Sequence, residues 1–406
     1  MIGGVRAVLP WLWGSGDPWL QAHDLQRIEV LLSQSRRRNR SGRHRRSERP
    51  ESERSPRGPS TLRNLVVLTL AAVASAAGLI WLTLQRVPLG LRPTYLGKSY
   101  AELAADPFHP APDNPVALRI LAPLLSYAVG LRGPYILWTN LITVAVFLAA
   151  VFLWFRSAGL GSWAALVGSS TLAFSTVVLT TLHYGGYPDT LTYLFVLLAF
   201  WASARPWLCG VLFFLALLNH EGAAFLAPWL LVVLARRRPR DPRRWLRASA
   251  RIVATLGAFA VVRWLQSRAH PGAEFSLQYY LAPLLEDPLT WFRESARFRG
   301  VGILSAFNLF WALPLVAAII MLRRGERVEA LTLVLPIPLA LAQLLVAYDV
   351  TRVATLAFPS VLLGAAYLLK TNAYAAQWWI PALVVANFFI PQVNVAMGVM
   401  DRMGPK

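Results

Sequence analysis

The amino-acid sequence predicts an all-α polytopic membrane protein with about 11 transmembrane helices and one amphipathic helix on the outer membrane surface. Three observations predict this class. Apolar residues make up 56% of the 406 residues, and 16 residues are tryptophan. Apolar segments of about 20 residues, the length that crosses a hydrocarbon core of about 30 Å, recur along the chain. Arginines gather in short segments between them, as they do in cytoplasmic loops.

The formal net charge of +20 does not by itself indicate a nucleic-acid partner. The basic residues lie in short loops, and we expect no nucleic-acid binding. Cys209 is the single cysteine, which excludes an internal disulfide and a cysteine-based metal cluster.

The chain divides at residue 63 into a basic tail and a membrane domain. Ser35 to Arg63 is rich in arginine, serine and proline and has almost no apolar residues, so we expect residues 1–63 to be a disordered cytoplasmic tail. Residues 64–400 form the predicted transmembrane domain, which begins with a span at Asn64 to Gln85. The arginines before this span place the N-terminus in the cytoplasm.

Residues 86–133 form the first predicted outer loop. Within it, Val116 to Leu131 is apolar but contains Arg119 and Pro123. If this segment crossed the membrane, all later loops would change sides, and the arginine-rich segment that starts at Arg236 would face outward. We therefore expect an amphipathic helix that lies along the outer surface.

The other crossings follow from the apolar segments and the basic residues between them. They are expected at 135–155, 162–182, 190–204, 207–235 (out and back), 252–266, 301–322, 328–347, 353–369 and 378–397, with a second outer loop at 267–300.

Trp207 to Arg238 is too long for one ordinary span and is interrupted by Asn219, His220 and Glu221. Two interpretations remain open. The segment is either one long helix with three polar side chains at mid-depth or two short helices joined at these residues. Ionisable groups inside a membrane are costly and usually line a cavity or a functional site.

Polar clusters other than the arginine-rich segments fall at the predicted outer ends of the helices. They are Asp106 and Asp113 in the first loop, the segments 183–189, 219–221 and 286–287, and Asp349 with Arg352. Each has a plain structural interpretation: Gly185 to Asp189 as a turn with a helix cap, and Asp349 and Arg352 as a local ion pair. Their common side nevertheless predicts one shared site.

This set of residues suits a lipid-linked substrate. Carboxylates can accept a proton, arginines can bind a phosphate through two hydrogen bonds, and apolar grooves can hold a lipid tail. The sequence has no phosphate-binding glycine loop, no HExxH zinc motif and no GxSxG motif. A donor that carries its phosphate on a lipid would fit a site at the outer face.

Four sequence segments, in this order and spacing, resemble the GT-C superfamily of polytopic glycosyltransferases, which use polyprenyl-phosphate-linked sugars. They are Arg119 to Pro123 after an acidic loop, Gly186 to Asp189, Asn219 to Glu221 with Pro228, and Asp349 to Arg352 with Phe358 and Pro359. The resemblance covers most of residues 65–369.

The resemblance implies a hexosyl- or mannosyltransferase-like enzyme of the cell envelope. An acidic residue of the first outer loop would be the catalytic base, with Asp106 the first choice and Asp113 the second. The implied substrate-binding residues are Arg119, His183, Tyr187, Asp189, Asn219, His220, Glu221, Asp349 and Arg352.

The implied partners are a polyprenyl-phosphate-sugar donor, an acceptor hydroxyl on a glycan, lipid or protein, and the surrounding membrane lipid. The chain lacks the adjacent acids, or the Asp-x-Asp, that stricter families have soon after the first helix. This difference leaves open which residue is the base and whether a divalent metal takes part; we expect no other cofactor.

Two other functions remain. A transporter or flippase for a lipid-linked sugar would also use buried charges, although no internal repeat is visible. A polysaccharide polymerase or ligase would share the outer-face site and the lipid-linked donor. The excess of arginine over lysine suggests a GC-rich bacterium and hence the plasma membrane.

Overall fold

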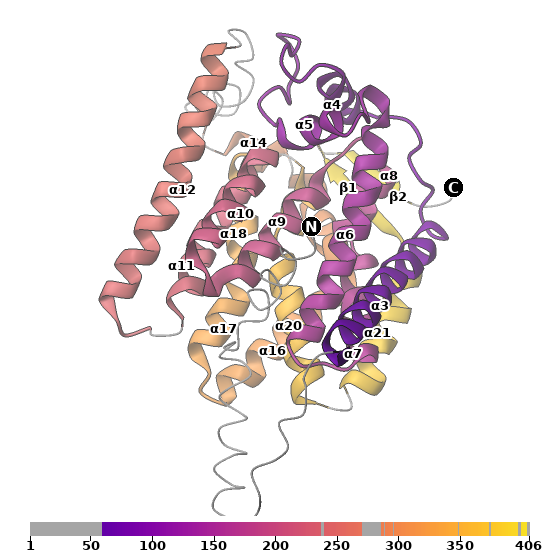
Figure 1. Cartoon of the computed structure of the whole chain (residues 1–406), viewed down its shortest axis with the longest axis vertical. Coiled ribbons are helices and arrows are strands. Elements are labelled where there is room, and N and C mark those ends of the chain that lie inside the picture. The colour runs from indigo at the N-terminus through magenta and orange to yellow at the C-terminus, as the bar shows by residue number, and fades with distance from the viewer. Residues whose placement is uncertain are drawn as a thin grey trace, which may run out of the picture.

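The computed structural model describes residues 59–236, 239–269, 286–287, 289–294, 296–347, 349–372, 375–396 and 399–403. Helices form most of it (Figure 1). Most of the predicted disordered tail lies outside the described residues. Helix α3 begins at Pro59, so the prediction of disorder is wrong for residues 59–63. Proline fits the first turn of a helix because the N–H that it lacks would have no partner there.

The first half of the chain forms helices around α6, whose side chains Val144, Phe147 and Val151 are fully buried. The helices are α3 (Pro59–Leu84), α4 (Leu96–Ala105), α5 (Leu121–Ala128), α6 (Ile136–Ser157), α7 (Ser162–Ala173), α8 (Thr176–His183), α9 (Asp189–Trp201), α10 (Pro206–Asn219) and α11 (Ala227–Ala235). Short 3-10 helices lie at Gly133–Tyr135, Ala202–Ala204 and Glu221–Leu226.

The second half adds further helices and one two-stranded sheet. The helices are α12 (Pro242–Ala269), α14 (Thr290–Glu294), α15 (Arg299–Phe307), α16 (Ala312–Arg323), α17 (Arg327–Val334), α18 (Pro336–Ala342), α19 (Val350–Thr355), α20 (Phe358–Thr371) and α21 (Ile380–Phe389). Shorter helical turns lie at Ala296–Phe298, Asn308–Trp311, Gln343–Leu345 and Ala375–Trp379. Strands β1 (Gln392–Ala396) and β2 (Val399–Met403) pair antiparallel, with Gln392 opposite Met403.

Six helical segments in the described part of the chain are long and apolar enough to cross a membrane. They are Arg63–Leu84, Gly133–Ser157, Pro242–Ala269, Ala296–Arg323, Arg327–Leu345 and Val350–Thr371. The pair α7 and α8, bent by 56°, adds a seventh if it forms one broken span. The chain is thus compatible with a multi-pass membrane protein, but eleven crossings are not confirmed, because 189–204, 206–219 and 221–235 are shorter apolar helices.

The spans differ in how much of their surface other parts of the protein cover. The Val350–Thr371 span is 89% buried and lies at the centre, whereas the spans in α3 and α12 are only 17% buried. Helices α3 and α12 lie at the edges of the helical bundle (Figure 1). Their exposed leucine, valine and tryptophan side chains are those that lipid tails would cover.

The predicted last span, 378–397, is wrong in its second half. Helix α21 ends at Phe389, and Gln392–Ala396 forms strand β1. Pro391 has no N–H to continue a helix. Val393 and Val395 alternate with polar residues, a pattern that favours a strand. The described chain is therefore mostly, but not entirely, α-helical.

The polar interruption at 219–221 joins two short helices, and the alternative of one long helix is wrong. Helix α10 ends at Asn219, and a 3-10 turn at Glu221–Leu226 leads into α11. Pro206 at the start of α10 and Leu234 near the end of α11 line the same cavity. The chain therefore goes out and returns to the same end of the protein.

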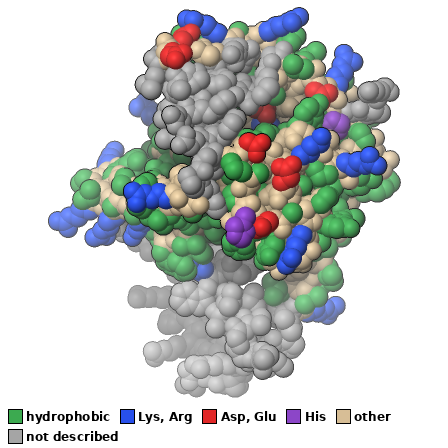
Figure 2. Space-filling model, turned by 90° about the horizontal axis from the view of Figure 1, so that it is seen from above, with side chains coloured by type: hydrophobic (Ala, Val, Ile, Leu, Met, Phe, Trp, Pro, Cys, Tyr) green, Lys and Arg blue, Asp and Glu red, His purple; other side chains and the backbone are tan. Residues whose placement is uncertain are grey.

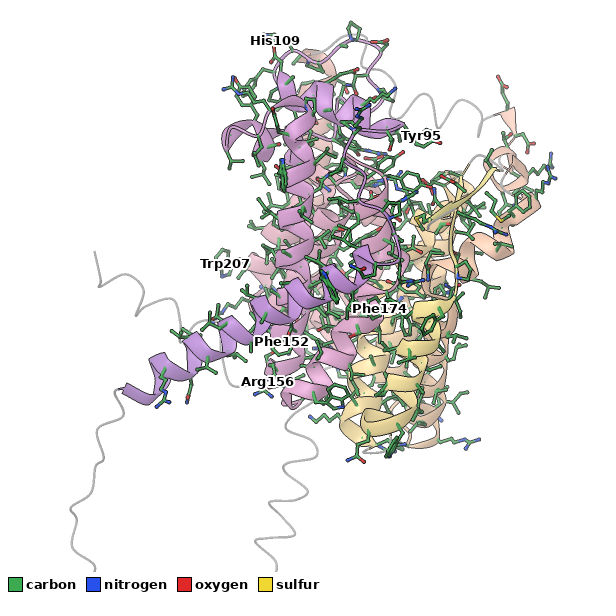
Figure 3. The ribbon with its side chains drawn as sticks, turned by 90° about the vertical axis from the view of Figure 1, so that its right-hand side faces the viewer. Tyr95, His109, Phe152, Arg156, Phe174 and Trp207 are labelled. Atoms are coloured by element: carbon green, nitrogen blue, oxygen red, sulfur yellow. The ribbon has the colours of Figure 1, made fainter. Side chains whose placement is uncertain are left out.

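The helix predicted to lie along the outer surface is α5. With eight residues it is too short to cross a membrane, and Leu121, Ala122, Pro123 and Ser126 are buried. Helices α4 and α5 lie at one end of the protein (Figure 1). His109 lies at this end and Arg156, at the end of α6, lies at the opposite end (Figure 3). Which end faces the cytoplasm stays a prediction.

The first loop contacts the Gly185–Gly186 turn backbone to backbone. A Cβ atom on Gly97 would lie 1.9 Å from the carbonyl oxygen of Gly185, and one on Gly185 would lie 2.2 Å from that of Arg92. Gly186 has a φ of +95°, which favours glycine. The glycines therefore hold the first loop directly against the start of α9.

We expect Gly97→Ala to destabilise the protein by about 1–3 kcal/mol, because the added methyl group overlaps backbone that cannot rotate away. The matched control is Gly78→Ala in α3, where a Cβ meets nothing within 4 Å and the change should be neutral or stabilising. The unfolding temperature in detergent measures both. Equal temperatures for the two variants would contradict the close packing.

Candidate functional site

Arg352, at the start of α19, binds two carboxylates; we call Asp189, Asp349 and Arg352 the Arg352 cluster. Its Nε and Nη2 donate to the two carboxylate oxygens of Asp189 at 2.8 and 2.7 Å, and its Nη1 donates to Asp349 at 3.1 Å. The side chains of Arg352 and Asp189 are only 10% and 6% exposed. This two-bond geometry fixes the plane of the guanidinium.

The local backbone explains how the two carboxylates reach Arg352. Asp349 caps α19, since its carboxylate accepts the backbone N–H of Arg352 at 3.3 Å. Asp189 is the first residue of α9, where the helix dipole favours a negative charge. Pro188 occupies the N-cap position and the carboxylate of Asp189 binds Arg352, so the interpretation of Asp189 as the helix cap is wrong. The predicted local pair of Asp349 and Arg352 is confirmed, with Asp189 as an additional partner.

Glu221, at the bend between α10 and α11, binds two arginines; we call Arg119, Glu221 and Arg263 the Glu221 cluster. Arg119 donates to both oxygens of Glu221, through Nη2 and, at 3.0 Å, through Nε. Arg263 of α12 donates to Glu221 at 3.2 Å and also to the carbonyl of Leu118. The cluster thus joins the first loop, the α10–α11 bend and α12.

One tyrosine contacts each cluster. Arg119 donates to the hydroxyl of Tyr100 at 3.3 Å, and the guanidinium carbon of Arg352 lies 4.6 Å from the centre of the Tyr187 ring. Burial raises the pKa of Tyr100, which the charges of Arg119, Asp189 and Arg352 also affect. Burial raises the pKa of Tyr187 to about 12. Both phenols are therefore neutral hydrogen-bonding groups at physiological pH.

Asn219 and His220 hold the backbone around Glu221. The amide nitrogen of Asn219 donates to the carbonyl of Pro188 at 3.0 Å and to Thr192 at 2.8 Å, which fastens α10 to the start of α9. Nδ1 of His220 accepts the N–H of Gly222 at 3.0 Å. Asn219 thus joins the bend that carries Glu221 to the turn that carries Asp189.

His183 lies outside both clusters. Its ring packs against that of Tyr184 with the centres 4.8 Å apart. The hydroxyl of Tyr184 donates to Asp401 of β2 at 2.7 Å, and Ala396 of β1 forms a backbone bridge to Asp349. The C-terminal hairpin therefore borders the Arg352 cluster.

Asp106 and Asp113, the predicted bases, are exposed on the first loop. Asp106 ends α4 and pairs with His109 at 3.0 Å, and the two side chains are 54% and 83% exposed. The bond from His109 lowers the pKa of Asp106. Within the described residues no hydrogen bond or ion pair joins Asp106 or Asp113 to either cluster.

The structure brings together most of the predicted substrate-binding residues: Arg119, Tyr187, Asp189, Asn219, His220, Glu221, Asp349 and Arg352. Seen from above the first loop, acidic and basic side chains lie among hydrophobic ones on this end of the protein (Figure 2). Residues 270–285, 288 and 295 of the predicted outer loop 267–300 lie outside the described residues. Within it, Asp287 pairs with Arg293 at 2.7 Å and accepts the N–H of Leu289 at 3.0 Å.

Four residues at or next to the clusters were not predicted from the sequence: Tyr100, Arg263, Gln343 and Asp401. Arg263 had a clear signal, because an arginine inside an apolar helix usually marks a site. Tyr100 and Asp401 had no such sequence signal, since an isolated tyrosine in a short helix within a loop and an aspartate near the C-terminus are both common. Gln343 is buried next to Gly222, where a Cβ would lie 2.4 Å from its amide nitrogen.

Among the residues that the structure describes, no three His, Cys, Asp or Glu side chains are grouped so that they could hold a metal ion. Carboxylates of the two clusters instead bind arginines.

The chain is thus a mostly helical protein with several potential membrane spans, and the Arg352 and Glu221 clusters lie at one end of it. A comparison with protein-family models finds none that matches the chain, and a comparison with curated proteins finds no significant similarity.

Proposed function

We propose that the protein is a glycosyltransferase that moves a sugar from a polyprenyl-phosphate donor to an acceptor hydroxyl at the outer face of a membrane. The observation that supports this most is the burial of the Arg352 and Glu221 clusters together at one end of the helical bundle. Buried charges are costly to maintain in an apolar protein, and they usually mark a functional site.

In the proposed reaction, Asp106 accepts the proton of the acceptor hydroxyl, and Asp113 is the alternative base. The acceptor oxygen forms a bond to the anomeric carbon of the sugar while the bond from that carbon to the phosphate oxygen breaks. The electron pair of the broken bond leaves on the polyprenyl phosphate. Because the displacement is direct, the anomeric configuration inverts.

Arg352 is the proposed group that stabilises the leaving phosphate. Two hydrogen bonds to Asp189 hold its guanidinium in place, whereas Asp349 accepts a side-chain bond from Nη1 alone. Burial raises the pKa of Asp349, and Asp189 nearby raises it further. Asp349 is therefore the weaker carboxylate partner, and a phosphate oxygen could replace it at Nη1 while Asp189 keeps the arginine oriented.

Arg119 and Arg263 form the second proposed cationic group, with Glu221 between them. The Glu221 side chain is 34% exposed, more than that of Asp189, so it is the more accessible of the two to a ligand. We assign it to binding sugar hydroxyls.

A transfer assay tests this function. Membranes that contain the full chain are given radiolabelled polyprenyl-phosphate hexoses and pentoses, and we expect label to move from the lipid to a membrane acceptor. Glu221→Gln should reduce this transfer by about tenfold or more, because it removes the charge that holds two arginines. Transfer from none of the donors, or an unchanged rate in the Gln variant, would reject the proposal. Movement of intact donor across the bilayer without transfer would favour a flippase.

A further inference from the structure

A second group of charges lies at the other end of the protein, where α11 leads into α12 (Figure 1). Arg244, Arg247 and Arg251 lie in the first part of α12 at spacings of three and four residues, so they share one face of the helix. With Pro206 of α10, Leu234 of α11, Asp241 and Ala248, they line a cavity of about 230 Å³.

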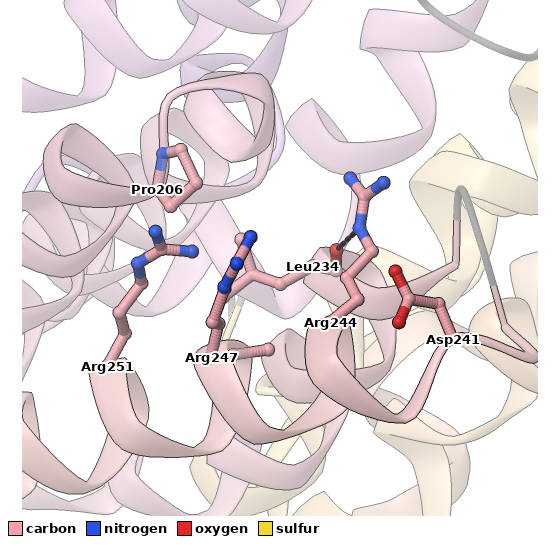
Figure 4. Close-up of a pocket in the computed structure, with 7 residues that line it drawn as sticks. Pro206, Leu234, Asp241, Arg244, Arg247 and Arg251 are labelled. Atoms are coloured by element: carbon pink, nitrogen blue, oxygen red, sulfur yellow. Dashed lines mark hydrogen bonds between the residues drawn. The ribbon is translucent and has the colours of Figure 1, made fainter.

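The arginine side chains point into this cavity. Figure 4 shows Arg244, Arg247 and Arg251 rising from α12 toward the side on which Pro206 lies. Arg244 donates through Nε to the carbonyl of Leu234 at 3.2 Å, which holds its side chain against the end of α11. Asp241 is the one acidic residue of the lining, so three arginines and one aspartate leave an excess of two positive charges.

The start of α10 adds to this positive potential. Pro206 is the first residue of this 14-residue helix and lines the cavity. The N-terminal end of a helix carries a partial positive charge, which favours an anion.

We propose that this cavity binds a phosphate group of an anionic ligand, such as the head group of an anionic membrane lipid. Guanidinium groups bind phosphate oxygens in pairs, and basic pockets between membrane helices on the arginine-rich side hold anionic head groups. The volume lies below the about 300–1,000 Å³ of pockets for drug-sized ligands, so it suits a single head group. The site lies at the opposite end from the ion-pair clusters and does not depend on the proposed transferase activity.

The simplest other explanation is a set of solvated arginines that only fix the orientation of the protein in the membrane. The two explanations differ in which arginines matter. A binding site requires Arg247 and Arg251, which line the cavity, whereas an orientation signal would depend equally on Arg240 and Arg243, which are exposed in the same segment outside the cavity lining.

Calorimetric titration of the purified full chain in a neutral detergent distinguishes them. The ligands are a short-chain phosphatidylglycerol, inorganic phosphate, and phosphatidylcholine as the zwitterionic reference. We expect R247Q/R251Q to weaken phosphatidylglycerol binding by about 30-fold and R240Q/R243Q, which removes the same charge, by less than about threefold. Unfolding temperatures without ligand verify that both variants fold.

The outcomes separate the sources of the phosphate. Binding of phosphatidylglycerol but not of inorganic phosphate supports a lipid head group, and binding of both with the same dependence on Arg247 and Arg251 supports a soluble phosphate compound. Equal weakening in the two double variants, binding of phosphatidylcholine as tight as that of phosphatidylglycerol, or no binding by the unmodified chain would overturn the proposal.

Discussion

Asp106→Asn is expected to reduce the rate of sugar transfer by about 10²- to 10⁴-fold, the contribution of a general base. The carboxylate is held by the backbone N–H groups of Phe108 and His109 and by the His109 ring, and an asparagine cannot accept the proton. The bond from His109 lowers the pKa of Asp106, so the base is ionised at neutral pH. Its activity should be lost only as the pH falls through this lowered pKa.

The matched control for this variant is Glu102→Gln, which also neutralises an exposed carboxylate at the end of α4. Its rate should stay within about twofold of the unmodified protein. Asp113→Asn tests the alternative base in the same assay. If Asp106→Asn retains the full rate while Asp113→Asn loses it, Asp113 is the base; if both variants retain it, the first loop does not supply the base.

Asp189→Asn is expected to destabilise the protein by about 3–5 kcal/mol, because it leaves the buried Arg352 without its two-bond partner. Asp287→Asn is the matched control. It removes an ion pair to Arg293 of the same 2.7 Å separation. In this pair the side chains of Arg293 and Asp287 are 68% and 36% exposed, whereas those of Arg352 and Asp189 are only 10% and 6% exposed. Exposed pairs contribute only about 0–1 kcal/mol.

Chemical unfolding in detergent, followed by tryptophan fluorescence, measures both variants. A loss for Asp189→Asn no larger than that for Asp287→Asn would mean that Arg352 finds another partner or water. The Arg352 cluster would then not be the rigid centre that the mechanism requires.

Helices α4 and α14 lie in the predicted outer loops and were not predicted. Apolar segments in the sequence were sufficient to predict the other helices from α3 to α20, because continuous apolar runs are a strong signal. They were not sufficient to predict the number of crossings. Helices α9, α10 and α11 are apolar but short, and whether such helices cross depends on how they bend and pack. The hairpin after Phe389 was missed because Val393 and Val395 lie in a segment apolar enough to resemble a further span.

The sequence also predicted that Asp189, Glu221 and Arg352 lie near one another, since all three stand at predicted outer ends of helices. Their partners could not be predicted in the same way. The two-bond contact of Asp189 with Arg352 joins residues 163 positions apart, and that of Glu221 with Arg119 joins residues 102 apart. Such pairings depend on helix packing, and a single sequence does not encode them in any local pattern.

The proposed outer-face reaction requires that the end of the protein with the two ion-pair clusters faces outward, and cysteine labelling measures this. In a chain with the buried Cys209 replaced by alanine, single cysteines at the exposed positions Ala111 and Arg243 are treated in intact cells with a membrane-impermeant maleimide. We predict that the cysteine at 111 reacts and that the one at 243 reacts only after the cells are opened. Labelling of position 243 with protection of position 111 would place the two ion-pair clusters on the cytoplasmic side and contradict the proposed outer-face reaction.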